Sequence, residues 1–238
     1  MTELTFLGVP IDSVGRAGGT EHGPAKLRAL GLADLCEADA GDLDVRIRGE
    51  VRDPVTGILG SADVLTTTTA IRQATAAALT SGERPFLVGG CCTVLPGALA
   101  AARDVLGRTA VAYLDGHLDL SDGVTSPTGE AADMPLSVAL GRGPAAWVDI
   151  CGGATSRVED VVPIGFRDPD EVPTLEQIAP ELGPAFRPIS MTRTAGIFRA
   201  ASTLPSVDAL STTTIWWARD GGFFFNDSRQ CTRSARAL

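Results

Sequence analysis

The sequence has little positive charge. Its 20 Lys and Arg residues stand against 29 Asp and Glu residues, which gives a formal net charge of −9, and Lys26 is the only lysine. Proteins that bind nucleic acid neutralise phosphate groups with Lys and Arg side chains. We therefore expect this chain to have no nucleic-acid partner.

Long apolar runs are also missing. No stretch approaches the roughly 20 apolar residues with which a helix spans a bilayer. The first residues, Met1 to Leu4, lack the basic start and apolar stretch of a signal peptide. The 5 cysteines are an odd count in a chain too long to need disulfide staples. These absences predict a cytoplasmic protein with reduced thiols and no membrane contact.

The length of 238 residues and a hydrophobic fraction of 44% fit one globular α/β domain. Short apolar runs alternate with helical stretches, a pattern typical of a parallel sheet with crossover helices. The predicted strands cover residues 4–9, 86–88, 110–114, 161–164, and 215–217 or 223–225. The predicted helices cover residues 25–32, 62–79 and 96–106.

Four loops should follow strands at one edge of this sheet. Ligands of open α/β sheets bind at the carboxyl ends of the strands. We therefore expect the functional side chains among residues 12–23, 89–93, 115–130 and 165–170.

The most informative of these loops starts with Asp115, His117 and Asp119, directly after an apolar run. Two carboxylates and an imidazole at this spacing are typical of a site for a divalent cation such as manganese, iron or zinc. The alternative interpretation is structural: the acids cap a following helix and His117 makes an internal hydrogen bond.

Cys91 and Cys92 follow another apolar run through a glycine turn, so the turn could direct a thiolate towards the same cleft. One alternative is a pair of small buried hydrophobic side chains. Another is a cysteine hydrolase in which Cys91 or Cys92 is the nucleophile, His117 the base, and Asp115 or Asp119 the group that orients it.

Five segments resemble the ureohydrolase family of arginases, agmatinases and formimidoylglutamases, in the family's order across about residues 4–168. Gly8-Val9-Pro10 and the later Gly23-Pro24 resemble the family's opening. Gly89-Gly90-Cys91-Cys92 is similar to Gly-Gly-Asp-His, and Asp115-Gly116-His117-Leu118-Asp119 to Asp-Ala-His-x-Asp. Residues 128–136 resemble Ser-Gly-Asn-x-His-Gly-x-Pro, and residues 164–168 an Ile-Gly-x-Arg strand end.

The resemblance implies a single arginase-like domain over residues 1–238, a three-layer α/β/α fold with a mainly parallel sheet. It implies two Mn²⁺ ions that activate water near neutral pH. The reaction would cleave a C–N bond of a small guanidino or formimidoyl compound, a linear amidine. Asp115, His117 and Asp119 would be metal ligands, and homo-oligomers are common in the family.

The sequence departs from the family pattern at two positions near these ligands. Cys92 stands where the best-known members have a histidine ligand, and a thiolate favours Zn²⁺ or Fe²⁺ over Mn²⁺. Ala132 stands where arginases have a histidine that passes a proton to the leaving amine. Asp133 or Glu130 could take its place. We therefore name Asp119 and Asp133 as the catalytic candidates.

A third departure concerns the last two family ligands, which come from a late Asp-x-Asp. Residues 223–227 resemble the incoming strand and make Asp227 a candidate ligand, but Arg229 follows where a second acid is expected. We interpret residues 226–238 as a tail unlike the family's, and the fold as incomplete at its C-terminus. The alternatives are a divergent exposed tail and, for function, a catalytically impaired homologue with a partial metal site.

Overall fold

The computed structural model describes residues 4–14, 19–166, 172–186, 188–190, 214–218 and 221–225. Its strands are β1 Leu4–Val9, β2 Ala38–Asp42, β3 Arg84–Gly89, β4 Val111–Leu114, β5 Val161–Phe166, β6 Ile189–Ser190, β7 Thr214–Ala218 and β8 Gly221–Phe225. Its α-helices are α1 Gly23–Ala29, α2 Ser61–Thr80, α3 Leu95–Leu106, α4 Pro135–Ala139, α5 Ala145–Ile150 and α6 Val172–Leu182.

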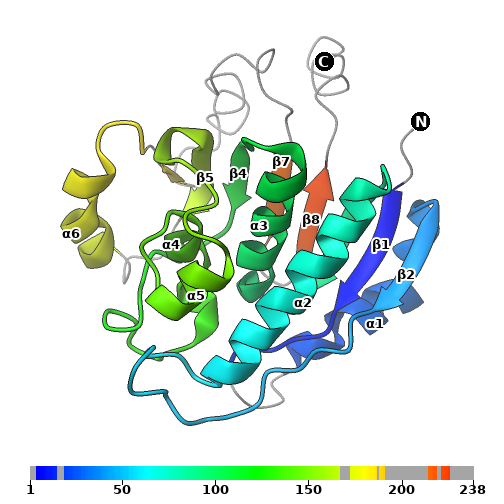
Figure 1. Cartoon of the computed structure of the whole chain (residues 1–238), viewed down its shortest axis with the longest axis horizontal. Helices are drawn as coiled ribbons and strands as arrows, with labels where there is room; N and C mark the ends of the chain where they lie inside the picture. The colour runs from blue at the N-terminus through cyan, green and yellow to red at the C-terminus, as the bar shows by residue number, and fades with distance from the viewer. Residues whose placement is uncertain are drawn as a thin grey trace.

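The strands form two sheets, with the orders β2-β1-β3 and β6-β5-β4-β7-β8. Every pairing is parallel except the hairpin of β7 and β8. β8 lies against β3, so the two sheets run side by side across the molecule (Figure 1). This order places the ends of β1, β3, β4 and β5 at one edge.

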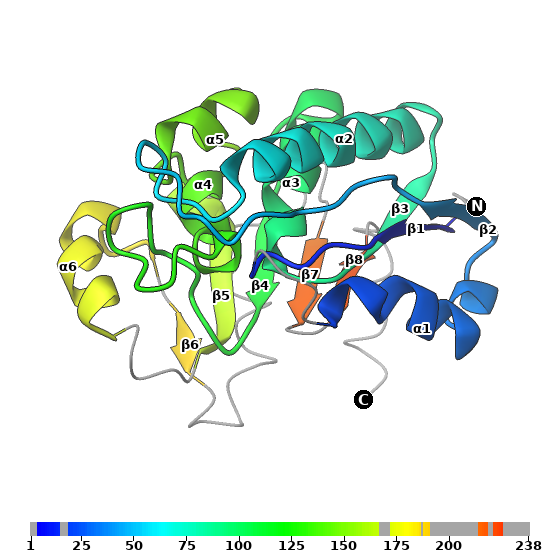
Figure 2. The same ribbon diagram turned by 90° about the horizontal axis from the view of Figure 1, so that it is seen from below.

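Helices cover both faces of the strands. α2, α3, α4 and α5 lie on one face, α1 lies on the other, and α6 lies at the edge beyond β5 (Figure 2). The predicted three-layer α/β/α arrangement with a mainly parallel sheet is confirmed.

Burial explains the composition of the central elements. β1 and β3 are covered on both sides and are almost wholly apolar, as expected for buried parallel strands. All residues from Leu95 to Ala102 of α3 are buried, so this helix lacks a polar face in its first two turns. Trp147 of α5 is buried and donates from Nε1 to Thr68 Oγ1 of α2 at 2.8 Å, which joins the helices of this layer.

The predicted strands agree with the structure to within a few residues, and both late candidates form strands. The helix predicted over residues 25–32 is shorter: α1 ends at Ala29, and Gly31 has a φ of 87°, which breaks the helix. β2 has no apolar run and was not predicted. Asp227, Arg229 and the whole of 226–238 lie outside the described residues.

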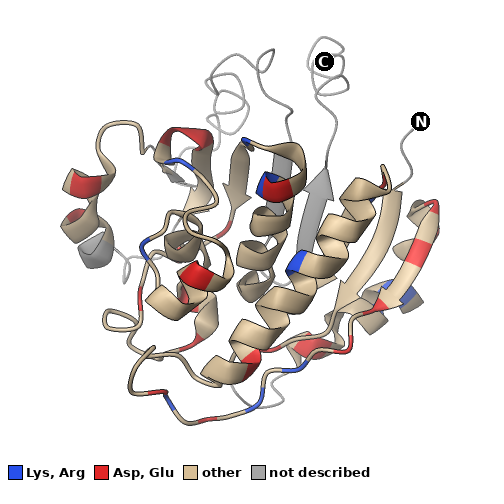
Figure 3. Ribbon diagram, viewed as in Figure 1, with Lys and Arg blue, Asp and Glu red and all other residues tan. Residues whose placement is uncertain are grey.

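Charged residues lie mainly in the loops, the helices and β2 (Figure 3). Acidic and basic residues both occur along the segment between β2 and α2 (Figure 3). In the described part of the chain, no helix has both the length and the apolar composition that a bilayer crossing requires.

Candidate metal centre

Three acidic or thiol side chains meet at the carboxyl ends of β3 and β4. Cys92 begins the 3-10 helix that follows β3, and Asp115 and Asp119 lie in the loop after β4. One donor atom from each lies within 4.8 Å of the other two, and all three residues are buried. The carboxyl ends of β3 and β4 thus bring together residues from two loops, as the sequence predicted, although the two strands belong to different sheets.

Glycine permits the close packing that brings Cys92 to this edge. A Cβ atom on Gly90 would lie 1.7 Å from the carbonyl oxygen of Ile11, so the turn after β3 packs directly against the chain that leaves β1. A Cβ atom on Gly89 would lie 2.5 Å from Val94 Cγ2. A side chain at either position would therefore clash, which explains why both residues are glycine. Cys92 follows in the position that faces Asp115.

Asp115 contacts both His117 and Cys92. Its Oδ1 accepts a hydrogen bond from the backbone N–H of His117 at 3.0 Å, and the Cys92 thiol lies 3.4 Å from its Oδ2. The Nδ1 atom of His117 lies 3.7 Å from the same Oδ1. His117 is thus beside Asp115, next to the three clustered donors.

Asp119 has a backbone conformation that few residues adopt. Its φ is 50°, and among the described residues it is the one non-glycine with a positive φ. Its carbonyl oxygen accepts from the N–H of Ser137 at 3.1 Å, and its Oδ2 accepts from the hydroxyl of Tyr113. Hydrogen bonds through both the backbone and the carboxylate therefore fix the residue.

Tyr113 is a site residue that the sequence interpretation missed. It is the only tyrosine of the chain, it lies on β4, and it is fully buried. Burial, followed by the charge of Asp119, raises the pKa of its hydroxyl well above the usual value, so the hydroxyl stays protonated and donates. Since strand residues two apart share a face, its position two residues before Asp115 was an available signal.

The surroundings of Cys92 distinguish a metal-binding thiol from a catalytic nucleophile. Burial, and then the carboxylates of Asp119 and Asp115, raise the pKa of Cys92 well above its usual value. Burial also raises the pKa of Cys91, although hydrogen bonds with Thr93 and Ser13 oppose the shift. A nucleophilic cysteine needs a lowered pKa. The environment therefore disfavours the cysteine hydrolase and suits a thiol that loses its proton to a cation.

Asp133 has a different environment. Its Oδ2 accepts from Ser126 Oγ at 2.6 Å and from Thr128 Oγ1 at 2.7 Å, so the carboxylate orders its own loop. Arg52 holds the same loop by donating to the carbonyl oxygens of Gly123 and Ser126, each at 2.9 Å. Asp133 is not part of the three-residue group.

The structure thus brings together Cys92, Asp115 and Asp119, places His117 beside Asp115, and places Asp133 in the adjoining loop. The alternative that the acids cap a following helix is wrong, because the next described helix along the chain is the 3-10 turn Ala131–Asp133, which begins after Glu130.

The donor set fits a divalent cation. Two carboxylates and a thiol at this separation repel one another when ionised, and burial strengthens that repulsion. A divalent cation would offset the repulsion and accept both oxygen and sulfur donors. Fold and site together define an α/β protein with a candidate metal centre at the carboxyl ends of its strands.

The sequence model of the Arginase family matches residues 2–207, and the chain belongs to this family. It is 30% identical over 176 residues to an arginase of Brevibacillus brevis, covering 71% of this chain and 58% of the relative. It is 28% identical over 180 residues to an arginase of Bacillus caldovelox, covering 72% and 60%. The chain therefore spans somewhat over half the length of these relatives.

Solved structures agree on the fold. The native arginase of Bacillus caldovelox superposes with a TM-score of 0.74 at 25% identity, covering 85% of this chain and 70% of the other. A formimidoylglutamase of Bacillus subtilis has a TM-score of 0.67 at 18% identity, covering 92% and 65%. The latter likeness concerns the fold alone.

Tyr113→Phe tests the role of the tyrosine hydroxyl. The ring stays, but the Asp119 carboxylate loses the hydrogen bond from the hydroxyl, so we expect the affinity for Zn²⁺ or Mn²⁺ to fall about 10- to 100-fold. Isothermal titration calorimetry measures the affinity, and circular dichroism in chelator checks the fold. Thr128→Val, which removes a hydroxyl from Asp133 instead, is the control and should leave the affinity unchanged. Equal affinities for wild type and Tyr113→Phe would contradict this role.

Metal binding should strengthen as pH rises. The raised pKa of Cys92 keeps the thiol protonated at neutral pH, and the cation must displace that proton, so affinity should gain up to about tenfold per pH unit from this group. Titrations in buffers of different ionisation enthalpy measure the protons released. Cys92→Ser should release fewer; the same release from both proteins would show that Cys92 does not ligate.

Proposed function

We propose that this chain acts as a metal-dependent hydrolase that cleaves a C–N bond of a linear amidine or guanidino compound. The observation that carries the proposal is the buried group of Cys92, Asp115 and Asp119 at the carboxyl ends of two strands in a chain of the arginase family. The proposal includes a small guanidino or formimidoyl substrate, a cytoplasmic location and a homo-oligomer, as expected from the sequence.

Each residue has a proposed role. Asp115, Asp119 and Cys92 hold the cation, and His117, beside Asp115, completes the ligand set. When bound, such a cation polarises the substrate and lowers the pKa of water. Asp119 is kept in its orientation by Tyr113 and Ser137.

Asp133 is the proposed proton donor to the leaving amine, since Ala132 stands at the position of the family's histidine. The backbone N–H of Ala132 donates to Ser13 Oγ at 3.2 Å, so this loop is fixed against the loop that follows β1. Any transfer from Asp133 must compete with the hydrogen bonds that Ser126 and Thr128 donate to it. We therefore propose a slower proton delivery than a free histidine provides.

The metal of this chain is proposed to differ from that of typical relatives. Two carboxylates suit Mn²⁺, which the family resemblance implies, but the thiolate of Cys92 shifts the preference towards Zn²⁺ or Fe²⁺. Asp227, the fifth proposed ligand, lies outside the described residues. Metal analysis of the purified protein measures whether it binds one cation or two.

One observation favours the second candidate function, a catalytically impaired homologue that retains the fold and a partial metal site. Within the described residues, there is one group of at least three clustered donors, and it has three members. Two dications close together would need more carboxylates to offset their repulsion. Activity measurements on metal-loaded protein separate the two candidates.

Asp119→Asn tests the hydrolase. The amide keeps the size of the side chain but removes one ligand charge, so release of urea or formamide should fall about 100-fold. Arginine, agmatine and formimidoylglutamate are the substrates to assay. Asp149→Asn, on the exposed side of α5, is the matched control and should keep wild-type rates. Hydrolysis that persists in chelator would contradict the proposal, whereas a metal-loaded but inactive wild type would favour the impaired homologue.

Cys92→His tests the metal preference. Imidazole suits Mn²⁺ better than thiolate does, so the ratio of Zn²⁺ affinity to Mn²⁺ affinity should fall on the order of tenfold. Competition titrations with both ions measure the ratio. The control is Cys36→Ser, which removes a thiol two residues before β2. An unchanged ratio in Cys92→His would show that the thiol does not set the preference.

A further inference from the structure

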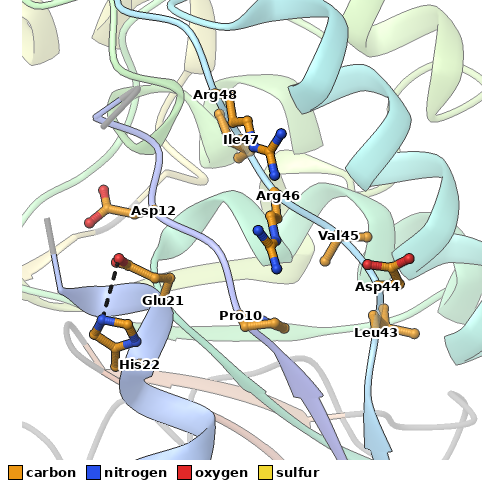
Figure 4. Close-up of a pocket in the computed structure, with 10 residues that line it drawn as sticks. All are labelled: Pro10, Asp12, Glu21, His22, Leu43, Asp44, Val45, Arg46, Ile47 and Arg48. Atoms are coloured by element: carbon orange, nitrogen blue, oxygen red, sulfur yellow. Dashed lines mark ion pairs between the residues drawn. The ribbon is translucent and has the colours of Figure 1, made fainter. Parts of the chain in front are cut away.

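A cavity lies between the loop that follows β1 and the segment that follows β2 (Figure 4). Its volume is about 440 Å³, within the range of sites for small molecules. The lining residues include none of the three clustered donors and are Pro10, Asp12, Glu21, His22, Leu43, Asp44, Val45, Arg46, Ile47 and Arg48.

The two sides of the cavity carry opposite charges. Asp12 and Glu21 lie on one side, and Arg46 and Arg48 on the other, with Arg46 reaching into the space between them (Figure 4). Asp44 adds a carboxylate on the arginine side. Among the described residues, no ion pair joins the Asp12 side to the arginines.

The acidic side is ordered by local hydrogen bonds. Asp12 is 7% exposed, and its Oδ1 accepts from the N–H of Val14 at 3.0 Å. Glu21 accepts from the N–H of Gly19 at 2.8 Å, and its other oxygen lies 3.7 Å from His22 Nε2. Each carboxylate is thus held in place before any ligand arrives, which lowers the cost of binding.

Apolar side chains also line the cavity, and three of them alternate with Asp44, Arg46 and Arg48 along the segment that follows β2. Pro10 and Leu43 line the cavity together with Val45 and Ile47, which are each 7% exposed. These groups can contact a short hydrocarbon chain and exclude water from it. The cavity therefore offers an acidic side, a side with two guanidinium groups and one carboxylate, and apolar groups in its wall.

The charges restrict the class of ligand. The carboxylates of Asp12 and Glu21 disfavour a simple anion, and the guanidinium groups disfavour a simple cation. A molecule with a cationic and an anionic group at its two ends satisfies both sides. We propose that this cavity binds a small zwitterion, an amino acid whose two charged groups are separated by a short carbon chain.

The cavity adjoins the metal centre without overlapping it. Ser13, next to Asp12, hydrogen-bonds with Cys91 and accepts from the N–H of Ala132. None of the residues proposed for catalysis lines the cavity, so ligand binding there can be tested separately from the proposed hydrolysis.

Calorimetric titration of the full chain with three probes of equal chain length tests the inference. The zwitterion 5-aminopentanoate should bind at least about tenfold more tightly than pentylamine or pentanoate, because each of these leaves one side of the cavity unpaired. Arg46→Gln and Glu21→Gln should each weaken its binding by about tenfold. Arg157→Gln, an exposed arginine on another loop, is the control and should have no effect.

Two further outcomes separate this cavity from the metal centre. Asp119→Asn should leave binding of 5-aminopentanoate unchanged, with and without added Zn²⁺. Loss of binding in that variant would place the probe in the metal centre and overturn the inference. Equal binding of all three probes, or no effect of Arg46→Gln and Glu21→Gln, would also overturn it.

Discussion

The site depends on the repulsion between acidic groups buried at one point. Asp115 and Asp119 are within 5% of full burial, and Cys92 is 6% exposed. In such surroundings, unpaired negative charges cost several kcal/mol, so either protons or a cation must compensate them. The pKa values of Cys92 and Tyr113 are raised, so both groups keep their protons and add no further negative charge beside the carboxylates. A divalent cation is the second solution, and the proposed chemistry requires it.

The fold supplies the rigidity that this arrangement needs. β3 and β4 end at the same edge, and Gly90 packs so closely against the Ile11 carbonyl that a side chain would not fit there. On the other side, Ser137 holds the backbone of Asp119 in its positive-φ conformation. The cavity between the loop after β1 and the segment after β2 carries acidic and basic side chains on opposite sides, and the proposed zwitterion site is therefore also at a strand end.

Much of this could be predicted from the sequence, because strand ends and glycine turns are local signals. The loop beginning at Asp115 and the turn before Cys92 both follow apolar runs, and they come together because the carboxyl ends of both strands lie at one edge. Tyr113 was missed because an aromatic residue inside a strand normally indicates core packing. β2 was missed because its Ala38–Asp42 sequence is polar and partly exposed, so pairing with β1 rather than burial makes it a strand. The cavity could not be predicted, since it depends on how the segment after β2 lies across the loop after β1.

Crystallography with anomalous diffraction tests the central claim most directly. Crystals grown with Zn²⁺, and separately with Mn²⁺, should show an anomalous peak at each metal's absorption edge within about 2.0–2.4 Å of Cys92 Sγ and of carboxylate oxygens of Asp115 and Asp119. A peak in that position would establish that buried acidic groups are compensated by a cation. Fully occupied metal elsewhere on the chain, with the Cys92 thiol and both carboxylates unchanged, would contradict the account.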